Sequence, residues 1–243
     1  MGRVIIHRPR PSVTAVRLAE GLRARGHDAV KSTRGRRPRP GSSLVSYGGF
    51  IDGVDGLNNT PLYGKLTELR LLGDAGVRCV EVCADTECQS EHLVRNRVHH
   101  GGLDLVNNTG SDFRVHRLPI DHEYRIHIWR DGDAFVSVRA GVKRPGGGDY
   151  HPWVRSHHAG WVVDYGAESR RSTLPASREL AKAAVSVLGL DFAGVDVAVL
   201  ADDTPVVLEV NRAPGLEGRT LDIYLDRIEK WLEEQREIGT VGA

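Results

Sequence analysis

The chain has 243 residues, of which 40% are hydrophobic and 27% are charged, and its formal net charge is +1. This composition is typical of a soluble globular protein with one large domain or two small ones, and it argues neither for nor against an acidic partner. No apolar run approaches the ~20 residues of a membrane span, and the N-terminus lacks the long apolar region of a signal peptide. We therefore expect a cytoplasmic location and no membrane partner.

The N-terminal segment predicts a small open α/β unit. Val4–Ile6 is a short β run, and Ser12 can cap a helix that continues to about Arg25. Gly26 follows as a left-handed stop, Ala29–Val30 begins a second strand, and Ser43–Tyr47 is a further strand. The order β-α-β is that of an α/β layer.

The next segment predicts a helix followed by two strands. Thr60-Pro61 provides a cap and a first-turn proline, and leucines at helical spacing lead to a stop at Gly73 or Gly76. Arg78–Val82 and Glu91–Arg97 are the expected strands, and Gly101-Gly102 lies in the loop after the second strand.

Three cysteines lie close together in this part of the chain. Cys79, Cys83 and Cys88 are an odd number, and their spacing is not that of a zinc site. We interpret them as small core or loop residues without a disulfide framework.

Leu118–Arg139 predicts a β-hairpin around Asp131-Gly132. Glu123, Arg125 and His127 share one face of its first strand because side chains alternate along a strand. A two-residue turn points Arg139 to the other face, whereas a three-residue loop brings it opposite Arg125, and the sequence is compatible with both.

The segment after this hairpin leaves its roles open. Lys143 and Arg144 precede the glycine-rich run 145–148, where they either close over a substrate or are solvated loop residues. The stretch 151–161 is dense in His, Trp and Arg, and either forms part of an acceptor site or packs in an ordinary way. Its histidines, and the pair His99-His100, lack the spacing of a zinc site.

Two helices and a second hairpin complete the chain. Ser177–Leu188 is amphipathic, and a final helix from Thr220 carries an apolar stripe that we expect to dock on a sheet. Between them, Gly194–Gly215 reads as two strands around a turn at Asp202–Asp203.

The register of this second hairpin follows from its turn. Asp196 then lies opposite Glu209, and Asn211 lies opposite Gly194, which has no side chain. The apolar face consists of three opposed pairs: Val195–Val210, Val197–Leu208 and Val199–Val206.

The polar face of this hairpin fits a hard cation. Two opposed carboxylates repel each other, and the sequence offers no obvious neighbouring cation to neutralise them. Mg²⁺ binds carboxylates, other oxygen donors and substrate phosphates. The alternative is a solvent-facing side of an edge hairpin.

The run from Asp196 to Leu208-Glu-Val-Asn-Arg-Ala-Pro-Gly215 resembles the metal-binding signature of the ATP-grasp superfamily. The resemblance extends over nearly the whole chain. It implies an α+β, α/β-type ATP-grasp fold, with a pre-ATP-grasp βαβ unit at 1–59 and antiparallel-sheet nucleotide-binding subdomains at 60–238. Residues 239–243 are a tail.

The resemblance also implies a function and a set of site residues. It implies an ATP-dependent carboxylate–amine (or thiol) ligase that forms an acyl phosphate and uses Mg²⁺, with Mn²⁺ as an alternative. The matching positions are Asp196, Glu209 and Asn211 for the metal; Lys65, Arg95, Arg97, Gly101, Gly102 and Glu123 for ATP; and Arg125, Arg139 and Arg212 for catalysis.

Two other functions compete with the ligase. One is an ATP-binding module without turnover. The other is a nucleic-acid-binding protein that uses the basic stretch Arg34–Arg39, which a net charge of +1 disfavours. We expect small-molecule or peptide carboxylate and amine substrates, and self-association is left open.

Overall fold

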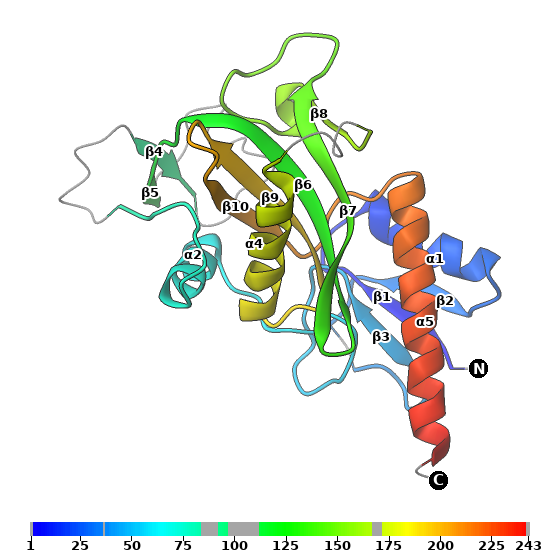
Figure 1. Ribbon diagram of the computed structural model, residues 1–243. Helices are drawn as coiled ribbons and strands as arrows, with labels where there is room; N and C mark the ends of the chain where they lie inside the picture. Colours follow the sequence, from blue (N-terminus) through cyan, green and yellow to red (C-terminus); the bar gives the residue numbers. More distant parts are fainter. Residues whose placement is uncertain (1, 36, 84–91, 97–111, 167–171, 242–243) are drawn as a thin grey trace. The chain divides into compact units, whose positions relative to one another are not determined.

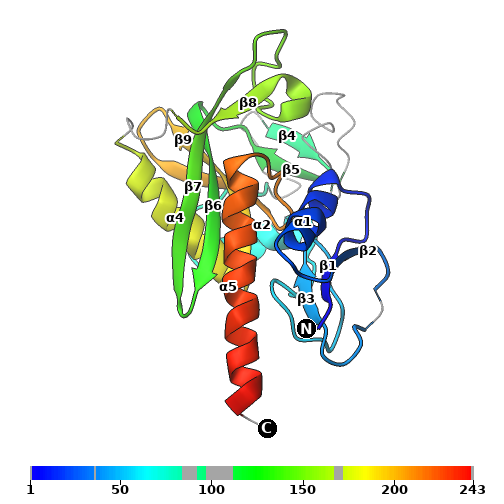
Figure 2. The same cartoon turned by 90° about the vertical axis from the view of Figure 1, so that its right-hand side faces the viewer.

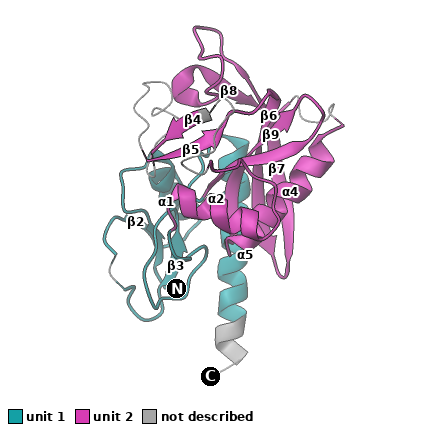
Figure 3. Ribbon diagram, turned by 90° about the vertical axis from the view of Figure 1, so that its left-hand side faces the viewer, with its two compact units in different colours: residues 1–62, 212–243 teal, residues 63–211 magenta. Residues whose placement is uncertain are grey.

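The computed structural model describes residues 2–35, 37–83, 92–96, 112–166 and 172–241. The chain divides into two compact units, residues 1–62 with 212–243 and residues 63–211 (Figure 3). The C-terminal helix therefore clusters with the N-terminal segment, whereas the sequence placed it in one domain with residues 60–238.

The first unit contains a three-stranded parallel sheet. Its order is β2 (Ala29–Ser32), β1 (Val4–His7) and β3 (Ser43–Ser46). The helix α1 (Val13–Ala24) begins where predicted, because Ser12 Oγ accepts a hydrogen bond from the Ala15 amide at 3.2 Å. Gly26 follows with a φ of +91°, the left-handed stop expected from the sequence.

The helix α5 (Arg219–Val241) packs against α1 (Figure 2). Gly21 of α1 makes room for Leu225, because a Cβ at that position would lie 2.5 Å from the leucine side chain. Arg25 adds ion pairs to Asp226 at 2.7 Å and Glu229 at 2.6 Å.

The second unit is built on a five-stranded antiparallel sheet. Its order is β10 (Pro205–Asn211), β9 (Phe192–Leu200), β6 (Ile120–Asp131), β7 (Ala134–Pro145) and β8 (Trp161–Asp164). The helix α4 (Leu174–Val187) lies along one face of the sheet (Figure 1). Its buried alanines pack against Val195 and Val197, which places the main core between α4 and the sheet. The other face of β6 and β9 carries the polar residues.

A smaller core lies beside this sheet in the same unit. The strands β4 (His92–Arg95) and β5 (Phe113–His116) pair antiparallel, and Phe113 and Val115 pack with Leu69 of α2 (Lys65–Asp74). The helix α2 begins five residues later than Thr60, with Gly64 at its N-cap, so the predicted start is wrong. The predicted strand Arg78–Val82 is reduced to isolated bridges at Cys79 and Val82.

The cysteines differ in state. Cys79 is a free, half-buried thiol, whereas Cys83 is disulfide-bonded, so the interpretation without a cross-link is wrong for Cys83. The short helix η1 (His157–Ala159) precedes β8. None of the described helices, including the 23-residue α5, combines the length and apolar character needed to cross a bilayer.

Candidate active site

The hairpin of β9 and β10 brings the predicted metal ligands together on one face. Asp196 pairs with Glu209 and Gly194 pairs with Asn211, as the sequence predicts. The register shifts between Val207 and Glu209, so the pairs predicted nearer the turn are wrong.

The extra residue at this bulge is Leu208. It lies outside the main core, which contains its neighbours Val207 and Val210, and packs against the smaller core instead. A bulge therefore lets Val207 remain buried toward α4 while Glu209 still faces Asp196. The sequence carries no signal for this shift, because a valine–valine–leucine run is compatible with either register.

Two cations hold Asp196. Arg125 lies opposite Asp196 on β6 and donates to both carboxylate oxygens, with Nη2 at 2.9 Å from Oδ2. Lys143 Nζ lies 2.9 Å from the same Oδ2 and also donates to Glu123. The expectation that no neighbouring residue neutralises Asp196 is therefore wrong.

Burial and charge shift the pKa values of this cluster. Burial opposes ionisation of Asp196, but Arg125 and Lys143 outweigh it and lower the pKa of Asp196 to about 2. Burial lowers the pKa of Lys143, but Asp196 and Glu123 outweigh it and raise that pKa. Burial also raises the pKa of Glu123, and the nearby Asp196 adds to the increase while Lys143 opposes it. Asp196, Lys143 and Arg125 are therefore charged at neutral pH.

Of the two roles that the sequence leaves open for Lys143, the solvated loop residue is wrong. Lys143 is only 9% exposed, and it follows Arg139 and Gly141 on one face of β7. The alternation that continues from Arg139 through Lys143 was the available signal. The glycine run at 146–148 suggested a linker instead, although β7 continues to Pro145.

Arg139 lies on the same face as Arg125 but opposite His127. The turn of this hairpin has two residues, and the register shifts at a bulge between His127 and Ile128. This shift brings Arg139 to the site face, which is the face of the sheet that carries Arg125 and Asp196. Neither of the two predicted arrangements is correct, because neither included the bulge. The Arg139 guanidinium stacks on the ring of Tyr165 at 4.0 Å, and Tyr165 Oη lies 3.0 Å from His127 Nε2.

His127 is fully buried within this positively charged surrounding. Burial, with Arg125 as the next cause, lowers the pKa of His127 to about 3. The ring is therefore neutral at pH 7 and can accept a hydrogen bond from Tyr165 or donate one to it.

Lys65 forms a separate ion pair of the site with Glu209. It is the first residue of α2, and its Nζ lies 3.3 Å from Glu209 Oε2. The Lys65 side chain is 10% exposed and that of Glu209 is 40% exposed. Within the described part of the chain, the Lys65 ammonium has a charged partner but no acceptor in regular hydrogen-bond geometry.

The remaining predicted residues belong to other parts of the chain or lie outside the described residues. Arg95 lies on β4, and Arg97, Gly101 and Gly102 lie outside the described residues. Arg212 belongs to the first unit, where Nη1 donates to the carbonyl oxygens of Thr60 at 3.1 Å and Pro61 at 2.6 Å.

The donor set fits Mg²⁺ with one restriction. Asp196 accepts three hydrogen bonds of about four that a carboxylate can accept, which leaves one acceptor position for a metal. Glu209 and Asn211 supply a carboxylate and an amide oxygen on the same face. Among the described residues no group of three His, Cys, Asp or Glu side chains is placed to hold a metal, so this site depends on the amide.

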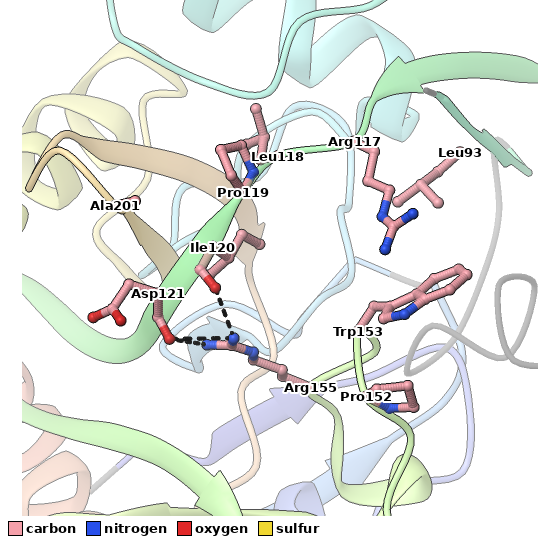
Figure 4. Close-up of a pocket in the computed structure, with 10 residues that line it drawn as sticks. All are labelled: Leu93, Arg117, Leu118, Pro119, Ile120, Asp121, Pro152, Trp153, Arg155 and Ala201. Atoms are coloured by element: carbon pink, nitrogen blue, oxygen red, sulfur yellow. Dashed lines mark hydrogen bonds between the residues drawn. The ribbon is translucent and has the colours of Figure 1, made fainter. Parts of the chain in front are cut away.

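A pocket of about 600 Å³ lies at the start of β6 (Figure 4). Arg155 donates to the carbonyl oxygens of Ile120 at 3.0 Å and Asp121 at 3.3 Å, and the Arg117 guanidinium stacks on Trp153 at 4.2 Å. Trp153 is 52% exposed. Pro152, Trp153 and Arg155 of the stretch 151–161 therefore line a cavity, whereas Val154, Ala159 and Trp161 of the same stretch pack in a small core.

Solved structures match almost the whole chain, although no family model matches it. The ATP-grasp ligase PsnB complexed with minimal precursor has a TM-score of 0.65 and 15% identity, covering 95% of this chain and 99% of that chain. A D-alanine–D-alanine ligase from Bacillus anthracis has a TM-score of 0.63 and 14% identity, covering 88% of each chain. The chain has the ATP-grasp fold.

Curated relatives match a shorter part of this ATP-grasp chain. A probable alpha-L-glutamate ligase of Citrobacter koseri is 42% identical over 71 residues, which are 28% of this chain and 23% of that protein. A ribosomal protein bS6–L-glutamate ligase of Escherichia coli is 41% identical over 71 residues, with the same shares. The match thus spans about a quarter of the length of these relatives.

Proposed function

We propose that the chain is an ATP-dependent ligase that joins a carboxylate to an amine through an acyl phosphate. The observation that supports this most directly is the face of β6, β7, β9 and β10, where Asp196, Arg125 and Lys143 form one buried ion-pair cluster beside Glu209. Charged groups held away from water at fixed positions suit the transfer of a phosphoryl group, which is catalysed mainly by positioning and electrostatics.

The proposed reaction has two steps. A substrate carboxylate oxygen attacks the γ-phosphorus of ATP, the bond to the β,γ-bridging oxygen breaks, and ADP leaves. The amine nitrogen then attacks the acyl carbon, phosphate leaves, and the amine releases a proton. No protein nucleophile is needed.

The chain's own cations have separate roles in this scheme. Lys65 is nine-tenths buried and lacks a regular hydrogen-bond acceptor, so a phosphate oxygen would satisfy it. Arg125 and Arg139 share the site face and would attract the transferring phosphoryl group. Arg95 and Glu123 are proposed nucleotide contacts, and Arg97, Gly101, Gly102 and Arg212 remain predictions.

Asp196, Glu209 and Asn211 would hold Mg²⁺, with Mn²⁺ as a substitute. When bound there, the ion would neutralise the charge that develops on the phosphates. Arg125 keeps Asp196 ionised and oriented, because its two donors fix both carboxylate oxygens.

We propose an amino acid as one substrate, with L-glutamate as the first candidate, because both curated relatives are named as glutamate ligases. The pocket beside Trp153 and Arg155 is the proposed site for the amine substrate. On this view Trp153→Ala raises the KM for the amine and leaves the affinity for Mg-ATP unchanged.

Formation of ADP tests the proposal. The full chain is incubated with Mg-ATP, candidate carboxylates and amines, and hydroxylamine is added to trap an acyl phosphate as a hydroxamate. The proposal expects ADP release that depends on the carboxylate, and hydroxamate in the same samples. Binding of Mg-ATP without ADP release for any carboxylate and amine would instead indicate a binding module without turnover.

A further inference from the structure

The carboxylates of the site face are matched by cations that belong to the chain. Asp196 pairs with Arg125 and Lys143, Glu123 pairs with Lys143, and Glu209 pairs with Lys65. Within the described residues, each of the three carboxylates thus contacts a cationic side chain, and Arg139 on the same face adds a further positive charge. This balance differs from that of a preformed cation site, in which carboxylates outnumber the cations around them.

The two lysine pairs differ in strength. Lys143 is buried and contacts two carboxylates, so removing it would take from the buried Glu123 the cation that contacts it and leave Asp196 with Arg125 alone. Lys65 approaches Glu209 at 3.3 Å without a regular hydrogen bond, and Glu209 is 40% exposed. The pair of Lys65 and Glu209 is therefore the one that can open at lower cost.

We propose that Lys65 and Lys143 neutralise the carboxylates that a bound metal ion would otherwise neutralise. As a result, the site accepts a divalent cation only together with the nucleotide. This inference rests on the proposed function. A divalent cation alone must compete with Lys65 for Glu209 and adds positive charge to a face whose carboxylates are already paired with cations. A triphosphate brings several negative charges, and its oxygens give the Lys65 ammonium the acceptors it lacks.

Lys65 then changes partner when the metal nucleotide binds. Its side chain leaves Glu209, which becomes available to the cation, and turns to a phosphate oxygen. The same residue thus disfavours binding of the metal alone and favours binding of the metal nucleotide. Opposite effects of one substitution on these two equilibria separate this role from a purely structural one.

Binding of Mn²⁺ without nucleotide tests the inference. The probe is MnCl₂ titrated into the full chain, with free Mn²⁺ measured by electron paramagnetic resonance. We expect weak binding to the unsubstituted chain and binding about tenfold tighter or more to Lys65→Met, a change that corresponds to about 1.4 kcal/mol. Lys65→Met should weaken binding of Mg-ATP in the same preparation.

Three further variants control this result. Lys182→Met removes a lysine that pairs with Glu179 on α4, away from the site face, and should bind Mn²⁺ as the unsubstituted chain does. In Lys65→Met/Glu209→Gln the gain should disappear. Lys65→Gln replaces Lys65→Met if the latter does not melt cooperatively.

Equal Mn²⁺ affinity in the unsubstituted chain and in the Lys65 variants would overturn the inference. So would a gain that persists in the double variant with Glu209→Gln. If the unsubstituted chain binds Mg-ATP in these cases, the proposed function stands and only the role of Lys65 fails. If the unsubstituted chain does not bind Mg-ATP at all, the proposed function itself fails.

Discussion

His127 should make the chain less stable in mild acid. Its ring is fully buried on the face shared with Arg125 and Arg139, and its pKa is lowered from 6.5 to about 3. The unfolded chain therefore binds a proton at His127 between about pH 6.5 and pH 3 that the folded chain does not bind. Stability rises with pH wherever the unfolded state binds more protons, so this contribution is lost as the pH falls through that window.

The size of the effect follows from the two pKa values. At pH 8 the ring is neutral in both states and the term is close to zero. At pH 5 the unfolded ring is almost fully protonated while the folded ring is neutral, so the free energy of unfolding falls by about 2 kcal/mol relative to pH 8.

Denaturant unfolding at pH 5 and pH 8 measures this term in two variants. His127→Gln has no titrating ring, and glutamine can still hydrogen-bond Tyr165 Oη. We expect the loss of stability between pH 8 and pH 5 to be about 2 kcal/mol smaller in His127→Gln. His158→Gln, at an exposed position, should retain the full loss. Equal losses in the unsubstituted chain and in His127→Gln would refute the reasoning.

Two further predictions concern single side chains. Arg125→Lys keeps the charge but loses the two-donor contact with Asp196, so the free energy of unfolding should fall by about 1.5–3 kcal/mol in denaturant titrations; an unchanged value would contradict the ion-pair geometry. Gly49→Ala places a Cβ 2.4 Å from the buried ring of His7 and should lower the free energy of unfolding by about 1–3 kcal/mol. Gly73→Ala has open space in α2 and should raise it by about 0.5–1 kcal/mol. Equal shifts of the melting temperature in the two variants would rule out the clash at Gly49.

The opposed pair Asp196 and Glu209 is predicted correctly although the pairs nearer the turn are not, because the bulge at Leu208 shifts the register by one residue and restores the predicted pairing. The bulges at Leu208 and between His127 and Ile128 were not predictable, since an extra residue in a strand leaves no mark in an alternating apolar pattern. These two bulges decide which side chains share the site with Asp196.

The counter-ions of Asp196 were missed for a different reason. Arg125 and Lys143 are 71 and 53 residues away from it in the chain, and only the sheet order β9-β6-β7 brings them to Asp196. Lys143 also precedes a glycine run that reads as a linker. The repulsion between Asp196 and Glu209 predicted a bound metal cation. Part of that positive charge is supplied by the side chains of Arg125 and Lys143.

Calorimetric titration of Mg-ATP into the full chain tests the central claim most directly. Glu209→Ala removes a proposed metal ligand. Glu179→Ala on α4 is the matched control, because Glu179 is exposed and forms an ion pair with Lys182 on the same helix. The account predicts Mg²⁺-dependent binding of ATP that Glu209→Ala abolishes and Glu179→Ala retains. Absence of binding, or binding indifferent to Mg²⁺ and to Glu209, would contradict it.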